Sequence, residues 1–241
     1  MTIAHEHASR RADWGAVLFA LVYPTLLTVV YFILLAGSST ALQQGTYAIG
    51  KFIQFAFPAL WIVGIQRTRV GWSRPRHREL VWGSVLGLGL LAAALAMYHF
   101  AVKPAGLFAG AAGASIRQKI EGFGVGSLSR YVVLAAFYSL VHSLLEEYYW
   151  RWFVFGRLRH LTSLPAAIGI SSLGFMAHHV CIVSTFFGWL SPMSIVLSLA
   201  VAAGGAIWAA IYHRTNSLFA PWLSHALVDA AIFLIGYDLV M

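Results

Sequence analysis

The chain has 241 residues, of which only eight are acidic and 16 are lysine or arginine. Charged residues make up 10% of it, hydrophobic residues 60%, and the mean hydropathy is +0.76. A soluble domain carries about 25% charged residues. Soluble and disordered proteins are therefore excluded. The basic residues are spread thinly, which is typical of charges that flank membrane spans and not of a nucleic-acid-binding domain. We predict an integral membrane protein.

The chain contains one cysteine, Cys181. A single cysteine excludes an intrachain disulfide framework and any zinc or iron–sulfur site built from several cysteines. A bound metal would therefore need histidine and carboxylate ligands. The length allows one membrane domain of about seven spans, at roughly 20 residues per span plus loops.

The first apolar run covers residues 14–36 and contains no charged residue. Arg10 and Arg11 precede it, as in a signal peptide. The apolar core of a signal peptide, however, has only about 7–15 residues. We therefore expect a helix that is retained in the mature protein.

The next two apolar runs cover 52–65, extended back to Tyr47, and 80–98. They are separated by an arginine-rich stretch at 66–78 and followed by a segment rich in glycine and alanine at 99–130. Short helical spacing inside that segment predicts either an amphipathic helix at the membrane interface or a plain surface loop. The pattern consists of Ile116, Ile120 and Phe123 among Arg117, Lys119 and Glu121.

Four more helices are expected in the second half of the chain, the first of them at 131–155. Residues 160–213 contain no Asp, Glu, Lys or Arg and are too many for one span. Gly188 and Pro192 are the expected break points. The resulting spans are 163–183, 193–212 and, after the next loop, 218–237.

The distribution of basic residues predicts the orientation of this all-α helical bundle. Ten lie in segments on the side of the N-terminus and five on the other side, so the positive-inside rule predicts N-in and C-out. Trp222 lies near a span end, as an interfacial tryptophan should. We expect three regions: a cytoplasmic tail at 1–13, N-terminal helices with the interfacial segment at 14–129, and a second set of helices at 130–237.

Seven titratable side chains fall inside predicted spans, where polar groups are costly unless they are paired or functional. A single such residue would be read as a hydrogen bond between helices. Seven of them on only three helices, the fourth, fifth and seventh, indicate a site. The residues are Glu146, Glu147, Asp229, His142, His178, His179 and His225.

Helical spacing pairs most of these side chains with one another or with a neighbouring residue on the same helix. Residues four apart share one face of a helix. Glu147 can therefore pair with Arg151, while Glu146, about 100° further round the helix, can face a cavity. The four pairs with this spacing are His142 with Glu146, Glu147 with Arg151, Phe175 with His179, and His225 with Asp229.

Three other hydrolase designs are excluded by the sequence. The only His-Glu pair, His5-Glu6, has no histidine three residues later, as a zinc metalloprotease of the His-Glu-x-x-His type requires. No Gly-x-Ser-Gly or Gly-x-Ser-x-Gly occurs. An aspartyl dyad needs two facing aspartates, and Asp229 is alone at depth because Asp238 lies at the far end. The nucleophile is then water, activated by glutamate and histidine.

Three motifs in the second half of the chain resemble those of a known family. Residues 146–151 match Glu-Glu-x-x-x-Arg, residues 175–179 match Phe-x-x-x-His, and residues 225–229 match His-x-x-x-Asn/Asp. In this order, each on an apolar helix, they resemble the CAAX protease and bacteriocin-processing family of intramembrane proteases, also called the ABI or CPBP family. The family implies a helical membrane peptidase that cleaves near the C-terminus of its substrates.

The resemblance also implies a role for each motif residue. Glu146 corresponds to the base that deprotonates water, and His179 shares that water. His225 and Asp229 correspond to the pair that stabilises the oxyanion. Because an ionised Asp229 cannot donate to an oxyanion, we expect it to orient His225 instead. The supporting residues are Glu147, Arg151 and Phe175.

Three positions depart from the family pattern or extend it. Trp152 stands where the family commonly has glycine after the motif arginine. His178 lies beside His179, and the spacing identifies His179 as the histidine of the motif. His178 is then expected to pack against or support the site. His142 has no counterpart in the pattern; it either tunes the neighbouring glutamate or makes a helix-interface contact.

The sequence leaves the metal question open. Glu146, His179 and His225 are three ligands of the kind that hold a catalytic zinc with an open position for water. We expect no cofactor, with Zn²⁺ as the alternative. Metal-free activation of water by glutamate and histidine is the preferred interpretation.

We therefore predict an intramembrane endopeptidase in the inner membrane of a prokaryotic cell. Its partners would be the lipid bilayer and a protein or peptide substrate with a membrane-anchored or lipid-modified C-terminal segment, with no role for nucleic acid. The alternatives are a proton-coupled transporter or relay, a haem protein with two histidine ligands, and a catalytically silent scaffold or immunity protein.

Overall fold

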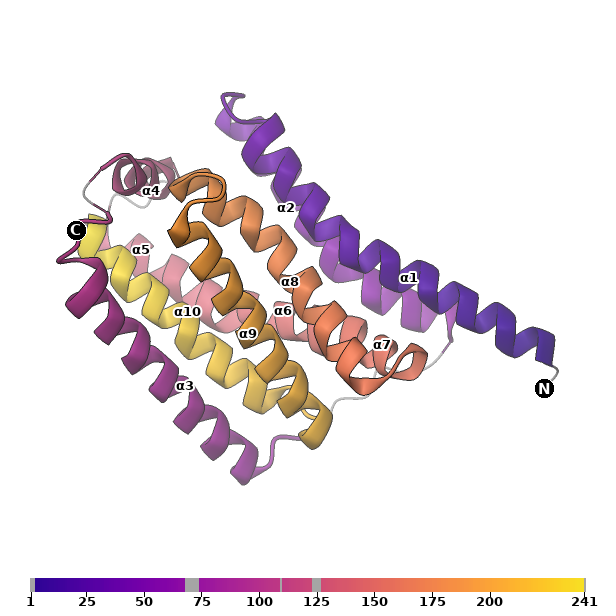
Figure 1. The fold of residues 1–241 in the computed structure, drawn as a ribbon. Helices are drawn as coiled ribbons and strands as arrows, with labels where there is room; N and C mark the ends of the chain where they lie inside the picture. Colours follow the sequence, from indigo (N-terminus) through magenta and orange to yellow (C-terminus); the bar gives the residue numbers. More distant parts are fainter. Residues whose placement is uncertain (1–2, 68–73, 109, 123–126, 241) are drawn as a thin grey trace. The chain divides into compact units, whose positions relative to one another are not determined.

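A computed structural model describes residues 3–67, 74–108, 110–122 and 127–240. Residues 68–73 of the arginine-rich stretch and Phe123 lie outside the described residues. Within these ranges every regular element is helical (Figure 1). The prediction of an all-α protein is confirmed.

The elements follow one another along the chain with few interruptions. In chain order they are α1 (Ile3–Val29), η1 (Val30–Leu34), α2 (Thr40–Leu60), η2 (Trp61–Ile65), α3 (His77–Met97), η3 (Tyr98–Val102), α4 (Ala111–Gly122), α5 (Leu128–Ala136), η4 (Phe137–His142), α6 (Ser143–Glu147), η5 (Tyr148–Phe155), α7 (Gly156–Leu161), α8 (Leu164–Phe187), α9 (Pro192–Thr215) and α10 (Phe219–Val240). The symbol η marks a π-helical segment.

Seven helical stretches within the described residues are long and apolar enough to cross a membrane. The number agrees with the prediction, and the chain is an integral multi-pass membrane protein. The N-in, C-out orientation stays a prediction. The stretches are Arg10–Leu34, Thr40–Ile65, His77–Val102, Leu128–Leu161, Leu164–Phe187, Pro192–Thr215 and Phe219–Leu239.

The break predicted between the fifth and sixth spans is confirmed. Helix α8 ends at Phe187, and Gly188 follows with a φ of +87°, a left-handed conformation that glycine adopts without steric cost. Helix α9 then begins at Pro192, whose ring fixes a helical φ at a position where no backbone donor is needed.

The chain forms two compact units. Unit 1 comprises Met1–Trp72 and Tyr148–His213, and unit 2 comprises Ser73–Glu147 and Arg214–Met241. Both boundaries in the second half fall inside continuous helices, after Glu147 and after His213. The predicted division into 1–13, 14–129 and 130–237 stays a prediction.

In unit 1, helix α1 packs against α8 and η5. The buried hydroxyl of Tyr149 donates to the Ala20 carbonyl over 2.8 Å. Close approach is allowed by Gly174, where an added Cβ would lie 2.5 Å from Leu21 Cδ2 and 3.0 Å from Trp150 Cζ3. A small residue at this crossing therefore brings the middle of α8 against η5 and α1.

In unit 2, helix α3 lies alongside α10 (Figure 1). The contact uses Gly83 and Gly87, four residues apart in a Gly-x-x-x-Gly pattern. A Cβ added to Gly83 would lie 2.8 Å from the Ala220 carbonyl oxygen, and one added to Gly87 would lie 2.9 Å from Ser224 Cα. Backbone contact of this kind is a typical way for membrane helices to associate.

The far end of α10 is held by polar contacts. The Asp238 carboxylate accepts from the Tyr98 hydroxyl and from Lys103 Nζ, each over 2.6 Å. Arg117 donates to the Leu239 carbonyl over 3.3 Å. Arg117 belongs to α4, so the amphipathic segment is a helix and not a plain loop. Its place at the membrane interface stays a prediction.

Replacing Gly87 by valine should destabilise the protein. An added Cβ would lie 2.6 Å from Leu227 Cδ1 and 2.9 Å from Ser224 Cα. The Leu227 side chain can change rotamer, but the Ser224 backbone atom can move away only if the helix shifts. We expect a loss of about 1–3 kcal/mol, as for an overpacked core. The measurement is the midpoint of thermal unfolding in detergent micelles.

The matched control is Gly89→Val in the same helix. Gly89 is exposed, and an added Cβ there meets nothing within 4 Å. Similar midpoints for the two variants would contradict the proposed packing of α3 on α10.

Candidate active site

The helix that carries the first motif is irregular in a way that the sequence does not reveal. The α-helical turn α6 carries Glu146 and Glu147 and lies between the π-helical segments η4 and η5. π-Helical segments are rare and occur frequently at functional sites. They change which residues share a face, so side-chain directions here cannot be extrapolated from the 3.6-residue period alone.

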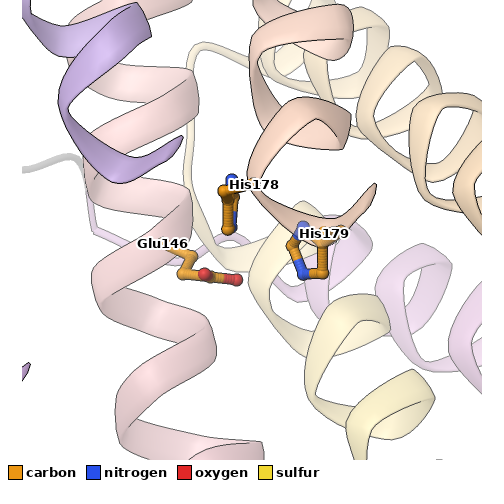
Figure 2. A group of neighbouring side chains, drawn as sticks. All are labelled: Glu146, His178 and His179. Atoms are coloured by element: carbon orange, nitrogen blue, oxygen red, sulfur yellow. The ribbon is translucent and has the colours of Figure 1, made fainter. Parts of the chain in front are cut away.

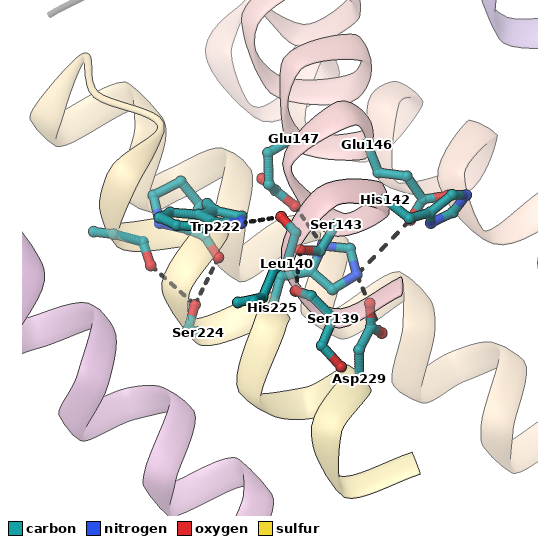
Figure 3. A network of polar contacts seen from close by, with 12 residues as sticks. Ser139, Leu140, His142, Ser143, Glu146, Glu147, Trp222, Ser224, His225 and Asp229 are labelled. Carbon is teal, nitrogen blue, oxygen red and sulfur yellow. Dashed lines mark hydrogen bonds and ion pairs between the residues drawn. The ribbon is translucent and has the colours of Figure 1, made fainter. Parts of the chain in front are cut away.

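Polar contacts fix the η4 segment and the start of α6. The Leu140 carbonyl accepts from the indole nitrogen of Trp222 over 2.9 Å (Figure 3). The buried Ser143 hydroxyl donates to the Ser139 carbonyl over 2.5 Å. Trp222 lies on α10 three residues before His225, so its hydrogen bond positions α10 against the helix of the first motif.

His225 is buried in unit 2 beside the two glutamates of the first motif. Its Nδ1 lies 2.8 Å from Glu147 Oε1. Because an ionised carboxylate only accepts, the imidazole Nδ1–H is the donor in this bond. Such a bond fixes both the tautomer and the ring orientation, and it leaves Nε2 for another partner.

The other nitrogen of the His225 ring faces two more carboxylates (Figure 3). His225 Nε2 lies 3.8 Å from Glu146 Oε2 and 3.7 Å from Asp229 Oδ1. His142 Nε2 lies 3.9 Å from Glu146 Oε1 on the opposite edge of that carboxyl group. These are ion-pair distances and exceed hydrogen-bond lengths. Five of the seven titratable residues predicted to form a site therefore converge within unit 2.

The network assigns Glu147 a contact that the sequence did not predict. Glu147 is completely buried and makes the hydrogen bond to His225, whereas we had expected it to pair with Arg151. Pairing with Arg151 stays a prediction. The orienting role of Asp229 also stays a prediction, and its carboxylate lies at Nε2, the ring nitrogen that Glu147 does not contact.

The second motif lies on α8 in unit 1. His179 Nδ1 lies 2.9 Å from the Phe175 carbonyl oxygen, one helical turn earlier. A carbonyl oxygen can only accept, so Nδ1 carries the proton and the neutral ring keeps Nε2 as an acceptor. An acceptor nitrogen is what a histidine needs to receive a hydrogen bond from water.

The neighbouring histidine has a different environment. His178 is buried, and its ring lies parallel to the indole of Trp150, with 5.7 Å between centroids. Figure 2 labels His178 and His179, which are neighbours in sequence on α8. The stacked ring is consistent with a packing role for His178. The identification of His179 as the motif histidine stays a prediction.

Arg151, the last residue of the first motif, is buried among aromatic rings. Its guanidinium carbon lies 4.6 Å from the centroid of Phe175 and 5.0 Å from that of Trp208. A buried guanidinium over aromatic faces makes a favourable cation–π contact. The arginine of the first motif is therefore in contact with the phenylalanine of the second.

Trp208 and Trp222 are residues of the candidate site whose contacts the sequence did not predict. Tryptophans in apolar runs look like ordinary core or interface residues. No spacing rule would have indicated that one contacts the Arg151 guanidinium and the other a backbone carbonyl.

Comparison with known proteins identifies the region that holds these residues. Residues 128–231 match the model of the family described as type II CAAX prenyl endopeptidase Rce1-like. No curated protein and no solved structure matches the chain. The matched region begins at the first residue of α5 and includes all three motifs. The resemblance inferred from the motifs is confirmed: residues 128–231 match an Rce1-like domain, which is consistent with the CAAX protease family.

Proposed function

We propose that this protein is an intramembrane endopeptidase that hydrolyses a peptide bond near the C-terminus of a membrane-anchored or lipid-modified protein. The Rce1-like domain supports a peptidase of the CAAX type. The observation that carries the proposal is the network in which the buried His225, Glu146 and Glu147 meet the half-buried Asp229. We place the protein in the cell membrane of a prokaryote.

Glu146 is the general base of this proposal. Its carboxyl group is buried, and one oxygen is directed to His142 and the other to His225. The carboxylate takes a proton from water as the water oxygen attacks the scissile carbonyl carbon. The same group then passes that proton to the leaving amine when the C–N bond breaks.

His179 assists by binding the attacking water. Its Nδ1–H is held by the Phe175 carbonyl, so its Nε2 accepts a hydrogen bond from the water. A second acceptor orients the water oxygen so that its lone pair faces the carbonyl carbon. Orientation of this kind contributes substantially to catalysis because it removes rotational freedom before the reaction.

His225 and Asp229 stabilise the oxyanion that forms when water attacks. The Glu147 carboxylate accepts the Nδ1–H of His225, and a second proton on Nε2 makes this nitrogen a donor to the oxyanion. Glu147 then stabilises the imidazolium, much as the buried aspartate does in a serine protease triad. Asp229, beside the same nitrogen, either orients it or donates as the protonated acid.

The first prediction from the proposed function concerns the general base, Glu146. Glu146→Gln keeps the size of the side chain but removes the proton acceptor, so kcat should fall by about 10²–10⁴-fold. The assay follows mass-spectrometric release of the C-terminal tripeptide from peptides with a prenylated cysteine, using purified protein in micelles. Glu121→Gln changes an exposed glutamate in α4 and is the matched control. Full cleavage by Glu146→Gln would eliminate the assignment.

The second prediction separates two roles for Asp229. The family motif has asparagine or aspartate at this position, and an asparagine amide can donate to an oxyanion. The orienting role that we expect for Asp229 depends on its charge, so Asp229→Asn and Asp229→Ala should both lose about 10²–10⁴-fold in kcat. An Asp229→Asn variant that keeps kcat within about tenfold of wild type would instead show that a hydrogen-bond donor at this position is what catalysis requires.

Zinc is not required in this proposal, although two imidazoles and a carboxylate are donors of the kind that zinc binds. Each Nδ1–H bond leaves the Nε2 of His179 and His225 as a ligand, and Glu146 supplies an oxygen. A zinc ion held there would activate water and polarise the carbonyl.

The third prediction tests the metal directly. After prolonged dialysis against a strong chelator, we expect cleavage at the wild-type rate, because the carboxylate and the histidines suffice to activate water. Metal analysis of the dialysed protein confirms the removal. Loss of cleavage that added zinc restores, and magnesium does not, would favour the zinc mechanism.

A further inference from the structure

Helix α9 carries none of the three motifs, yet one of its side chains contacts a motif residue. Trp208 is 4% exposed, and its ring lies 5.0 Å from the guanidinium carbon of Arg151. The other ring beside that guanidinium belongs to Phe175, at 4.6 Å. Within unit 1, Arg151 therefore lies beside two neighbouring rings, one on α9 and one on α8.

The Phe175 residue links this arrangement to the histidine of the second motif. Its ring centroid lies 4.7 Å from that of His179, and its carbonyl oxygen accepts the His179 Nδ1–H. Its ring is also 6.2 Å from that of Trp208, at an interplanar angle of 72°. Any shift of Phe175 thus changes both the ring contact and the hydrogen bond that orient His179.

A close helix crossing fixes the position of Trp208. An added Cβ at Gly205 would lie 3.3 Å from Phe175 Cδ1 and 3.3 Å from Ser172 Cα. Helix α9 therefore approaches α8 one turn before Trp208, at the level of the motif phenylalanine. This crossing allows a large ring on α9 to reach Arg151.

We propose that Trp208 is a positioning residue for His179, acting through Arg151 and Phe175. The proposal rests on the proposed function, in which His179 binds the attacking water. The indole face holds the guanidinium against Phe175, and the Phe175 backbone and ring hold the imidazole. Tryptophan is the strongest aromatic partner for a guanidinium, and the contact is strongest where water is excluded.

The test compares Trp208→Leu with Trp208→Phe. Leucine removes the aromatic face, and we expect kcat to fall about 10- to 30-fold, the effect of losing a buried cation–π contact, with KM changed less than twofold. Phenylalanine keeps a smaller face and should recover part of the loss. Trp189→Leu changes a tryptophan that is 59% exposed and should leave kcat unchanged.

A double-mutant cycle distinguishes positioning through Arg151 from a general packing defect. Arg151→Lys keeps the charge but loses the planar group that stacks on rings. If Trp208 acts through Arg151, adding Trp208→Leu to Arg151→Lys should cost less than threefold more. The proposal would be overturned if the loss of kcat in the double variant equalled the product of the losses in the two single variants. A wild-type kcat for Trp208→Leu would also overturn it. If Trp208→Leu fails to fold, the cycle is run with Trp208→Phe, whose loss of kcat should be smaller in the Arg151→Lys background than in the wild-type background; an equal loss in both would overturn the proposal.

A spectroscopic measurement is independent of peptidase activity. In protein with ¹⁵N-labelled histidine, the His179 Nδ1–H signal, assigned by its loss in His179→Gln, should shift or broaden in Trp208→Leu and not in Trp189→Leu. An unchanged signal would overturn positioning. If the His179 signal shifts in Trp208→Leu while the wild-type protein cleaves no candidate peptide, the result supports positioning and counts against the proposed function.

Discussion

The hydrogen bond between His225 and Glu147 is the interaction on which the candidate site depends. Both groups are buried in helices long enough to cross a membrane, where an uncompensated charge is costly. The 2.8 Å contact compensates part of that cost and fixes which ring nitrogen faces Glu146 and Asp229. Removing either partner would leave the other buried and unpaired, which usually destabilises a protein more than replacing both partners by apolar residues. The chemistry and the stability of unit 2 are therefore linked through one bond.

The helices around this bond are fixed by contacts that involve little or no charge. Gly83 and Gly87 bring the backbone of α3 against α10, and the Trp222 indole ties α10 to the Leu140 carbonyl of η4. Lipid tails provide no hydrophobic drive for helix association, so close backbone approach and hydrogen bonds are the main sources of specificity. Both contacts lie within a few residues of His225, and they hold α10 in place without adding titratable groups. A polar site in a membrane needs such a frame, since its own groups are too few to hold the helices.

The sequence predicted the number of spans, the break at Gly188 and the family, because hydropathy and i, i+4 spacing report directly on them. It did not predict the π-helical segments on either side of α6, or contacts such as the bond from Trp222 to Leu140, because hydropathy and i, i+4 spacing report on one regular helix at a time. For the same reason the partner of Glu147 was not anticipated. Helical spacing points to a residue on its own helix, whereas the contact in unit 2 is made by a residue 78 positions away. Spacing within one helix cannot reveal a partner on another.

Because the chain has few acidic residues, its structural carboxylates can be told apart from those of the candidate site by their positions and partners. Asp13 accepts a hydrogen bond from Gln66, Glu79 caps the start of α3, and Asp238 binds Tyr98 and Lys103; all three lie at or near the end of a helical stretch. A structural ion pair needs one carboxylate for one imidazole. Around His225 there are three, and a fourth group, His142, lies beside one of them. This excess has no use in packing, and its cost in a membrane makes it hard to retain without a function. Proton transfer and oxyanion binding by a hydrolase require several titratable groups around one point, which supports the peptidase over a silent scaffold.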